Sequence, residues 1–553
     1  MDSHRAGPGR ARARRLIRAG WVVLALAAGM SVPMKALDVQ VDVSPLRELP
    51  ACSGQFVAHD LDHVTTVPHG DRVRMFEANG AGVGINDLDN DGDLDIVLAN
   101  HAGQNSILWN EGAGVFRTER MDTRASRGVT LIDFDGDGWT DLFFTRVASA
   151  PNLWRSQHDG TFRREVLNRV AEPLYATGWA DLDGDGDLDL VGGTYDAELL
   201  TELGNDFLMS GRGGVYVYER SGDRLIPTRL AGEAQALALL LTDVNGDGRL
   251  DILIGNDFAV PDNAWLRTEV GWEAAAPFTA TSYSTMSLDA ADVDNDGRDE
   301  VFSTDMKPFE DSAATRAAWE PILSGLPNTT PKLDNPQVSA NVLEVAEGGA
   351  FRNEAPERGL DATGWSWSGK FGDLDRDGFL DLYVVNGMIE FTTFAHLPDH
   401  ELVEENQALR NDGRGFFVPA PEWNLRSSRS GRGMSMADLD GDGDLDIVVN
   451  NLRGAAQWFE NQICGGESLL VDLRWPDSGN TRAVGARLKL QTDQGTFTRE
   501  VRASSGYLSG DPSQIHFGFP AGTILTTLDI IWPDGTHTQL ESLTPHTRVT
   551  VTR

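Results

Sequence analysis

The stretch DLDNDGDLD, residues 87–95, decides the fold because its pattern occurs seven times in the chain. The copies (loops 1 to 7 in chain order) are DLDNDGDLD at 87–95, DFDGDGWTD at 133–141, DLDGDGDLD at 181–189, DVNGDGRLD at 243–251, DVDNDGRDE at 292–300, DLDRDGFLD at 373–381 and DLDGDGDLD at 438–446. Each copy has carboxylates or an amide at positions 1, 3 and 5, glycine at position 6 and a carboxylate at position 9. Oxygen ligands on alternate residues converge on one cation only where the backbone turns sharply, which glycine permits. The motif therefore predicts seven hard-cation sites, and an all-oxygen ligand set favours calcium.

The predicted calcium ligands are the side chains at positions 1, 3, 5 and 9 and the main-chain carbonyl at position 7, where the residue type varies. They are Asp87, Asp89, Asp91, Asp93 and Asp95; Asp133, Asp135, Asp137, Trp139 and Asp141; Asp181, Asp183, Asp185, Asp187 and Asp189; Asp243, Asn245, Asp247, Arg249 and Asp251; Asp292, Asp294, Asp296, Arg298 and Glu300; Asp373, Asp375, Asp377, Phe379 and Asp381; and Asp438, Asp440, Asp442, Asp444 and Asp446.

The EF-hand is excluded although its loop begins in the same way. An EF-hand needs a bidentate glutamate at position 12 and a helix on each side of the loop. Position 12 is Leu98 in the first copy and Val449 in the last, and no copy has a glutamate there. The flanks, such as DLDIVLAN at 93–100, are rich in apolar and β-branched residues. Each loop is therefore expected to join two strands.

The spacing of the copies predicts an all-β fold, a seven-bladed β-propeller in which each blade carries one calcium loop. Successive copies begin 46, 48, 62, 49, 81 and 65 residues apart. Four short strands in about 40–50 residues are the period of a propeller blade. A linear array of calcium-stiffened modules is the alternative. The ring is favoured because blade seven has only three strands at the C-terminal side, at 433–437, 445–450 and 456–461, and the segment 53–61 resembles the missing fourth strand.

The two cysteines lie at the expected seam of this ring. Cys52 precedes the segment 53–61, and Cys464 follows the third strand of blade seven. A Cys52–Cys464 disulfide would replace the hairpin turn that an uncut blade has at this place. Two unrelated buried thiols are the alternative.

Composition indicates an exported protein that does not bind nucleic acid. The formal net charge is −37, from 47 basic and 84 acidic residues, which opposes a polyanionic partner. Residues 1–36 are different, because six arginines precede an apolar run from Ala19 to about Met34. This pattern predicts an export signal, and the rest of the chain has no predicted transmembrane span. We expect a periplasmic, cell-surface or secreted location, where calcium is available.

Three repeats are longer than the others, with insertions at about 195–213, 304–340 and 387–405. Each follows a second strand, so all three are expected on the face opposite the calcium loops. Polar or aromatic residues near these strand ends and insertions are the candidate contacts for a protein, glycan or small-molecule ligand: His101, Arg146, Asn256, Trp319, Trp365, Trp367, Asn386 and Asn450. Loops that merely cover the channel are the alternative, and the two tryptophans of TGWSW are also explained by blade packing.

Residues 465–553 lack the metal motif and alternate as short strands, which predicts a separate small β-sandwich or barrel after a propeller at 37–464. The chain resembles a known family on these residues. The seven DxDxDGxxD loops resemble the FG-GAP/VCBS repeats of integrin-α-like propellers. The tail, with VGARLKLQT at 484–492, ASSGYLSG at 503–510 and IWPDGT at 531–536, resembles the ASPIC/UnbV domain. The order of the two is similar to that in bacterial relatives of cartilage acidic protein.

This resemblance implies an exported calcium-binding propeller that acts in adhesion or ligand binding. It does not imply a reaction. Up to seven calcium ions are expected, with weaker binding at 243–251 and 292–300, where Asn245 and Glu300 replace aspartate and Arg249 and Arg298 stand at position 7.

An enzyme is the alternative function, with structural calcium and a pocket under the three insertions. Lyase, cyclase or hydrolase chemistry would draw on Asp196, Asp257, Asp305, Glu310, Arg316, His396 and His400. His396 and His400 have the spacing of half a zinc site, but Pro398 between them breaks the helix that such a site needs. A solvated helix at 312–323 is the other interpretation of the acidic and basic residues of the second insertion. A scaffold subunit that docks through the tail is a further alternative.

Overall fold

The computed structural model describes residues 39–48, 52–222, 224–325 and 335–553. The predicted export signal at 1–36 and residues 326–334 of the second insertion lie outside the described residues. The described chain is nearly all β, which confirms the predicted fold class. None of its helices within these ranges is long and apolar enough to cross a membrane.

Seven antiparallel sheets (blades 1 to 7) each contain four strands that follow one another across the sheet, and loop 1 to loop 7 join their first and second strands. Blade 1 contains β3 (Val83–Asn86), β4 (Asp95–Leu98), β5 (Ser106–Asn110) and β6 (Phe116–Arg120), and blade 2 contains β7 (Ser126–Ile132), β8 (Asp141–Arg146), β9 (Ser149–Ser156) and β10 (Phe162–Glu165). Blade 3 contains β11 (Leu174–Ala180), β12 (Asp189–Thr194), β13 (Val215–Ser221) and β14 (Arg224–Ala231), and blade 4 contains β15 (Ala236–Thr242), β16 (Asp251–Asn256), β17 (Asn263–Thr268) and β18 (Gly271–Ala275).

Blade 5 contains β20 (Leu288–Ala291), β21 (Glu300–Ser303), β24 (Val342–Glu347) and β25 (Ala350–Asn353), and blade 6 contains β26 (Gly364–Gly372), β27 (Asp381–Asn386), β30 (Gln407–Asn411) and β31 (Phe417–Pro419). Blade 7 contains β32 (Gly431–Ala437), β33 (Asp446–Asn451), β34 (Ala455–Gln462) and the N-terminal strand β2 (Gln55–Val64).

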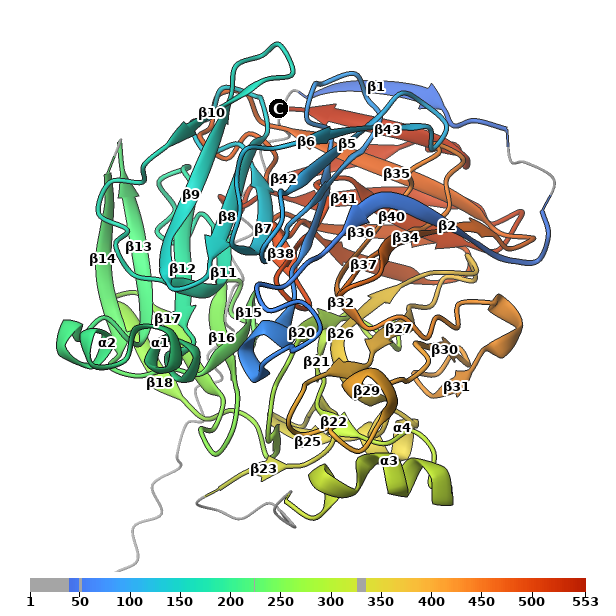
Figure 1. Cartoon of the computed structure of the whole chain (residues 1–553). Coiled ribbons are helices and arrows are strands. Elements are labelled where there is room, and N and C mark those ends of the chain that lie inside the picture. The colour runs from blue at the N-terminus through green and yellow to red at the C-terminus, as the bar shows by residue number, and fades with distance from the viewer. Residues whose placement is uncertain (1–38, 49–51, 223, 326–334) are drawn as a thin grey trace, which may run out of the picture. The chain divides into compact units, whose positions relative to one another are not determined.

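The blades form a closed ring of the propeller type (Figure 1). The first strand of each blade contacts the first strand of the next, from β3 through β7, β11, β15, β20 and β26 to β32, and β32 contacts β3 again. β2 pairs antiparallel with β34, with Phe56 opposite Asn461. The Cys52–Cys464 disulfide joins the two sides of this seam, with 5.2 Å between the Cα atoms, which confirms the predicted pairing.

Side-chain alternation along the strands packs each blade between its two neighbours. In β8, Phe143 lies in the apolar cluster that includes Trp179 of blade 3, with ring centroids 5.1 Å apart. The flanking Leu142 and Phe144 lie in the cluster shared with blade 1. Because neighbouring residues of a strand point to opposite faces, one apolar run supplies the core on both sides of the blade.

The three insertions follow second strands, as predicted. The first holds α1 (Asp196–Leu203) and α2 (Asn205–Ser210); the second holds β22 (Met306–Lys307), α3 (Ala313–Leu323) and β23 (Gln337–Val338); the third holds β28 (Met388–Ile389), η2 (Pro398–His400) and β29 (Glu401–Leu402). Remaining short elements are η1 (Met75–Asn79), β19 (Thr281–Ser282), α4 (Ala355–Arg358) and η3 (Pro421–Trp423). Connections from second to third strands lie at the blade ends opposite the metal loops, so we call that side the insertion face and the other the metal-loop face.

The tail, residues 467–553, contributes β35 (Glu467–Arg474), β36 (Arg487–Thr492), β37 (Thr496–Glu500), β38 (Ser504–Ser505), β39 (Ser509–Gly510), β40 (Ile515–Phe519), β41 (Leu525–Ile531), β42 (His537–Glu541) and β43 (Thr547–Thr552). Two of its sheets have the strand orders β1-β43-β35-β40 and β37-β36-β41-β42. The strand β1 (Gln40–Pro45) belongs to the first of them, although 37–464 was predicted as propeller. β43 pairs parallel with β35 and leaves its other edge open, and β1 pairs with that edge.

A hairpin of the tail, β38–β39, occupies the centre of the ring. β39 contacts the first strands of blades 1, 2 and 7, and β38 contacts those of blades 3 and 4. Gly506 forms a bridge to Leu288 of blade 5, and the Tyr507 N–H donates to Ser368 of blade 6 at 3.3 Å. The small residues of SSGYLSG allow a hairpin to fit in this narrow space. The tail and the propeller therefore share a core, which the sequence did not predict.

Candidate metal centre

Glycine at position 6 gives every loop the sharp turn that converging ligands require. All seven of these glycines have a positive φ, from +84° at Gly248 to +98° at Gly92. Position 4 also has a positive φ, even where it is not glycine, with φ of 59° at Asn90 and 56° at Arg376. Two left-handed residues in one loop turn the side chains at positions 1, 3 and 5 toward the same side.

The carboxylate at position 9 fixes each loop to its blade. One of its oxygens accepts the N–H of position 2, at 2.9 Å from Leu182 to Asp189 and at 3.0 Å from Val293 to Glu300. In every loop except loop 5, its other oxygen accepts an N–H from the third strand of the same blade, as from Arg220 to Asp189 at 2.7 Å. This second role of position 9 was not predicted, because the donor lies 15 to 31 residues further along the chain.

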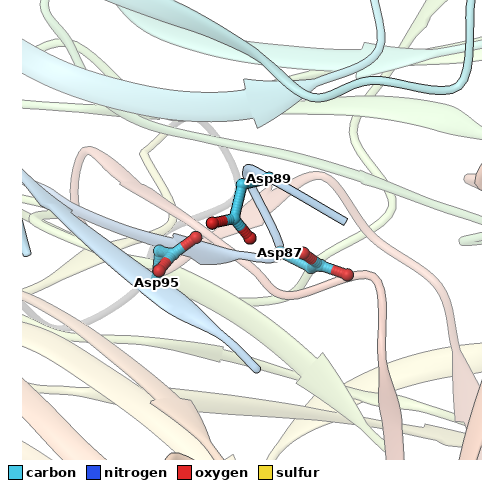
Figure 2. A group of neighbouring side chains, drawn as sticks. All are labelled: Asp87, Asp89 and Asp95. Atoms are coloured by element: carbon cyan, nitrogen blue, oxygen red, sulfur yellow. The ribbon is translucent and has the colours of Figure 1, made fainter. Parts of the chain in front are cut away.

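The carboxylates at positions 1, 3 and 9 gather as a cation site requires. One oxygen from each of Asp87, Asp89 and Asp95 lies within 4.8 Å of the other two, and so do the corresponding groups of loops 2, 3, 5 and 6. Figure 2 shows the three side chains of loop 1 next to one another. Several of the side-chain ligand oxygens are buried without a hydrogen-bond partner, among them one each of Asp87, Asp292, Asp294 and Asp375. A buried carboxylate oxygen without a donor is costly unless a cation binds it. The residues therefore fit calcium, whose two positive charges would offset part of their negative charge.

The pKa values of the position-9 carboxylates are raised, as expected for a cation site that holds no cation. Burial raises the pKa of Asp95, Asp141 and Asp189 to about 8, and the backbone donors only partly oppose it. For Glu300, burial and then the charge of Asp294 raise the pKa to about 9. Without metal these carboxylates favour the protonated form near neutral pH, whereas a bound dication favours the charged form.

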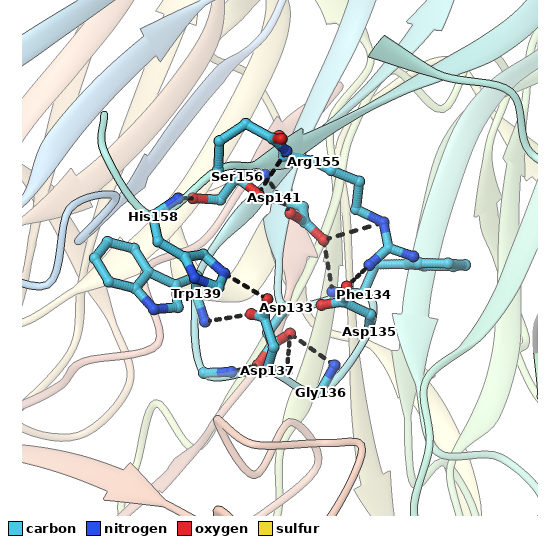
Figure 3. Close-up of polar contacts among 12 residues, drawn as sticks. Asp133, Phe134, Asp135, Gly136, Asp137, Trp139, Asp141, Arg155, Ser156 and His158 are labelled. Carbon is cyan, nitrogen blue, oxygen red and sulfur yellow. Dashed lines mark hydrogen bonds and ion pairs between the residues drawn. The ribbon is translucent and has the colours of Figure 1, made fainter. Parts of the chain in front are cut away.

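Loop 2 also has an arginine and a histidine side chain at its ligands (Figure 3). Arg155 forms an ion pair with Asp135 and lies 3.9 Å from Asp141. His158 bonds Asp137 at 2.7 Å and stacks on Trp139 with ring centroids 4.9 Å apart. These partners come from the third strand of blade 2 and the turn after it, so the loop sequence alone did not reveal them. In loop 4, Arg249 bonds Asp247 at 2.6 Å, which agrees with the expectation of weaker binding there without testing it.

The tail covers the metal-loop face and donates hydrogen bonds to the position-6 carbonyls. The pairs are Arg548 Nη1 to Gly92 at 2.7 Å, Arg482 Nη2 to Gly138 at 3.2 Å, the Asn480 N–H to Gly186 at 2.8 Å and His516 Nε2 to Gly443 at 3.1 Å. Arg487 and Arg502 form ion pairs with Asp299 of loop 5. Phe497 lies so close to Gly378 of loop 6 that an added Cβ would be 2.8 Å from its ring. The tail thus contacts the loops of most blades.

Two cavities lie between the tail and the metal loops. One of about 150 Å³ borders loops 5 and 6 and is lined by Asp292, Asp373 and Arg499, among others. The other, of about 320 Å³, borders loop 1 and is lined by Asp87, Asp91, Asp472, Arg474 and Arg548, among others. Neither borders the insertions.

Most of the residues predicted to contact a ligand on the insertion face are buried and bond other parts of the propeller. His101, Asn256, Asn386 and Asn450 are buried, and Asn450 donates to the carbonyls of Gly82 and Ala99. Trp319 and Trp365 are buried with ring centroids 5.9 Å apart. The Trp319 indole N–H and the Trp365 backbone N–H both donate to Glu404. Trp367 is buried below Arg432 and donates to the Gly387 carbonyl. Arg146, at the end of β8, is partly exposed.

Two of the candidate catalytic residues, Asp257 and Asp305, are buried near each other, and burial together with the charge of Asp257 raises the pKa of Asp305 to about 8. Asp257 is buried against the Tyr195 hydroxyl at 2.5 Å, and Asp305 is buried and accepts the Tyr283 N–H at 2.8 Å. Asp196 accepts from Thr194 at 2.5 Å and from the Ala234 N–H. Glu310 is exposed, and Arg316 forms an exposed ion pair with Asp311. The Nε2 of His396 bonds the Ala318 carbonyl. The His400 ring packs against the ring of Phe391.

Comparison with protein-family models places FG-GAP-like repeats at 87–144, 133–192, 243–303 and 399–449, and an ASPIC and UnbV domain at 476–553. Comparison with curated proteins gives no match. Among solved structures, "BBS1N in complex with ARL6DN" soaked with mercury is similar at 10% identity and a TM-score of 0.39, covering 69% of this chain and 94% of that chain. The lead-soaked crystal of the same complex gives 9% identity, a TM-score of 0.39, and coverage of 75% and 98%. The chain is therefore a protein of FG-GAP-like repeats that ends in an ASPIC and UnbV domain.

Proposed function

We propose that this chain is an exported calcium-binding β-propeller that acts as a ligand-binding or adhesion module. The observation that carries the proposal is the repeated loop, in which carboxylate oxygens gather within 4.8 Å and several of them are buried without a donor. Oxygen clusters of this kind suit calcium at extracellular concentrations. The disulfide supports export, because disulfides persist in oxidising compartments.

The insertion face is the proposed binding surface, because the tail covers the metal-loop face and fills the centre of the ring. The helices α1 and α2 present exposed apolar side chains there, Leu200, Leu203, Leu208 and Met209. The exposed fraction of Met209 is 87%, which is unusual for an apolar side chain without a partner.

The test has two stages. Calcium binding is measured first by titration calorimetry on the mature chain. Binding to immobilised extracellular proteins and glycans is then measured for the wild-type protein, for the double variant Leu208→Asp with Met209→Asp, and for Val166→Asp, an exposed control on the rim of blade 2. We expect calcium-dependent binding that the double variant loses and the control keeps. Absence of calcium binding, or equal binding by all three proteins, would overturn the proposal.

A further inference from the structure

Neighbouring metal loops bond to each other where position 4 carries a side chain. Position 4 is glycine in loops 2, 3, 4 and 7, but it is Asn90 in loop 1, Asn295 in loop 5 and Arg376 in loop 6. The Asn90 amide donates to the position-6 carbonyl of Gly138 in loop 2 at 3.2 Å. The Asn295 amide donates to the corresponding carbonyl of Gly378 in loop 6 at 3.1 Å. Arg376 lies 3.5 Å from a carboxylate of loop 7. A side chain at position 4 therefore reaches the loop of the following blade.

Loops 1 and 2 are joined in both directions. Position 8 of loop 2 is Thr140, where five of the other six loops have leucine. Its buried hydroxyl donates to the main-chain carbonyl of Asp87 in loop 1 at 3.0 Å. Thr140 lies between position 7, whose carbonyl is a predicted ligand, and the position-9 ligand Asp141. Each loop thus bonds the backbone of the other next to predicted calcium ligands.

The bond from Asn90 acts on a peptide group that also orients a ligand. The Gly138 carbonyl and the Trp139 N–H belong to the same peptide group. This N–H donates to the carboxylate of Asp137, the position-5 ligand of loop 2, at 2.9 Å. Because a peptide group is planar and rigid, a bond that fixes its carbonyl also fixes the direction of its N–H. Partners that orient metal ligands in this way change the affinity for the metal.

The tail supports this link through Arg482, which is only 5% exposed. Its Nη2 donates to the Asn90 side-chain oxygen at 2.9 Å and to the Gly138 carbonyl at 3.2 Å. A guanidinium can only donate, so it holds the oxygen of the Asn90 amide toward Arg482. The amide nitrogen is then free to donate to loop 2. One tail residue therefore fixes both partners of the bond between the two loops.

We propose that loops 1 and 2 bind calcium as a cooperative pair, with Asn90, Thr140 and Arg482 as positioning residues. A loop that holds its ion has a fixed backbone and presents fixed hydrogen-bonding groups to its neighbour. The second ion then binds to a loop that has already lost part of its conformational freedom. Such coupling is reciprocal and typically changes an affinity by about 5- to 150-fold. The inference rests on the proposed function, because it requires calcium in both loops.

The experiment uses terbium(III), a hard cation that takes oxygen ligands as calcium does and emits light when a nearby tryptophan transfers energy to it. Trp139 is the only tryptophan in the seven loops, so it reports on loop 2. The part of the signal that Trp139→Phe removes belongs to this loop, and phenylalanine occupies the same position in loop 6. The full mature chain and its variants are titrated at high salt, which screens the long-range effect of changes in charge.

Asp89→Asn removes a predicted ligand of loop 1 and should lower the terbium affinity of loop 2 by about fivefold or more. In the Asn90→Gly background the same change should lower it by less than about twofold, because the bond between the loops is absent. Asn90 is exposed and four loops have glycine at this position, so Asn90→Gly should fold. Thr140→Val removes the other bond and should reduce the coupling in the same way.

Asp375→Asn is the matched control. It removes the same position-3 ligand from loop 6, whose blade adjoins neither blade 1 nor blade 2. It should leave the terbium affinity of loop 2 unchanged. An equal fall for Asp89→Asn in both backgrounds, or no fall in either, would overturn this inference while leaving the proposed function intact. A wild-type chain that binds no calcium would overturn the proposed function itself.

Discussion

At the scale of single residues, position 9 of a loop has a structural role in the blade, whereas position 3 is expected to act mainly as a calcium ligand. Asp189 is fully buried and accepts two backbone N–H groups, whereas Asp183 is exposed. Asp189→Asn should lower the free energy of unfolding by about 1–3 kcal/mol even in excess chelator, because the amide nitrogen that replaces one carboxylate oxygen cannot accept a hydrogen bond and leaves one of the two buried N–H groups without an acceptor. Asp183→Asn should cost less than about 0.5 kcal/mol in chelator and mainly weaken calcium binding. Urea unfolding with and without calcium measures both, and equal effects in chelator would contradict the structural role of position 9.

The raised pKa values of the same carboxylates predict an inverted pH dependence for the metal-free protein. Burial raises the pKa of Asp95 and Asp141 to about 8, above the value of about 4 expected in the unfolded chain. Between these values the folded state holds more protons, so the stability of the metal-free protein should fall as pH rises from about 4 to 8. Calcium should bind more tightly over the same range, because protons compete for its ligands. Thermal unfolding in chelator at pH 5 and pH 8 tests this, and greater stability at pH 8 would contradict it.

At the scale of elements, the hairpin β38–β39 ties the tail to the propeller through Tyr507. This side chain is fully buried, and its hydroxyl lies 2.7 Å from that of Tyr175 and donates to the Asn79 carbonyl at 2.9 Å. Tyr507→Phe should cost about 1–3 kcal/mol of unfolding free energy, and Tyr507→Ala about 3–5 kcal/mol. Tyr283→Phe, at a partly exposed tyrosine, is the control. An unchanged free energy of unfolding in Tyr507→Ala would show that the hairpin does not stabilise the ring.

The seam in blade 7 is the second element that can be tested. β2 closes the blade from the other end of the chain, and the Cys52–Cys464 disulfide crosses the seam over 412 residues. A cross-link over such a span removes much freedom from the unfolded chain, so replacing both cysteines by serine should cost several kcal/mol. The variant should also expose β2 to limited proteolysis before the other blades. Proteolysis at the wild-type rate would contradict a closure role for the disulfide.

The elements that recur in every repeat could be predicted from the sequence, and the contacts that occur only once in the chain could not. The loops, the strands on both sides of them, β2 in blade 7 and the disulfide could be foreseen because seven copies expose the one incomplete copy. The docking of the tail could not be foreseen, because its donors, such as Arg548, Asn480 and His516, follow no period and bond acceptors between 73 and 456 residues away. The burial of Asn386 and Asn450 was not predicted either. The sequence cannot distinguish a polar residue at a strand end that faces water from one that faces a neighbouring blade.

At the scale of the whole molecule, calcium binding and docking of the tail should be coupled. The tail bonds carbonyls whose direction is set by the loop turn, so a loop that holds its ion presents a fixed acceptor. Removing calcium should loosen the tail before the apolar blade cores unfold. Hydrogen exchange followed by mass spectrometry should show faster exchange at residues 476–490 in chelator than in calcium, with smaller changes in β8 and β16. Equal protection of the tail in both conditions would contradict the coupling.

The central claim is that calcium in the repeated loops stabilises the ring, and a thermal unfolding scan with a parallel calcium analysis tests it most directly. Each ion at a hundredfold excess over its dissociation constant contributes about 2.7 kcal/mol. We therefore expect several bound ions per chain, at most seven, and a melting temperature that falls by more than about 10 °C in chelator. A chain that binds no calcium and melts at the same temperature with and without chelator would contradict the account.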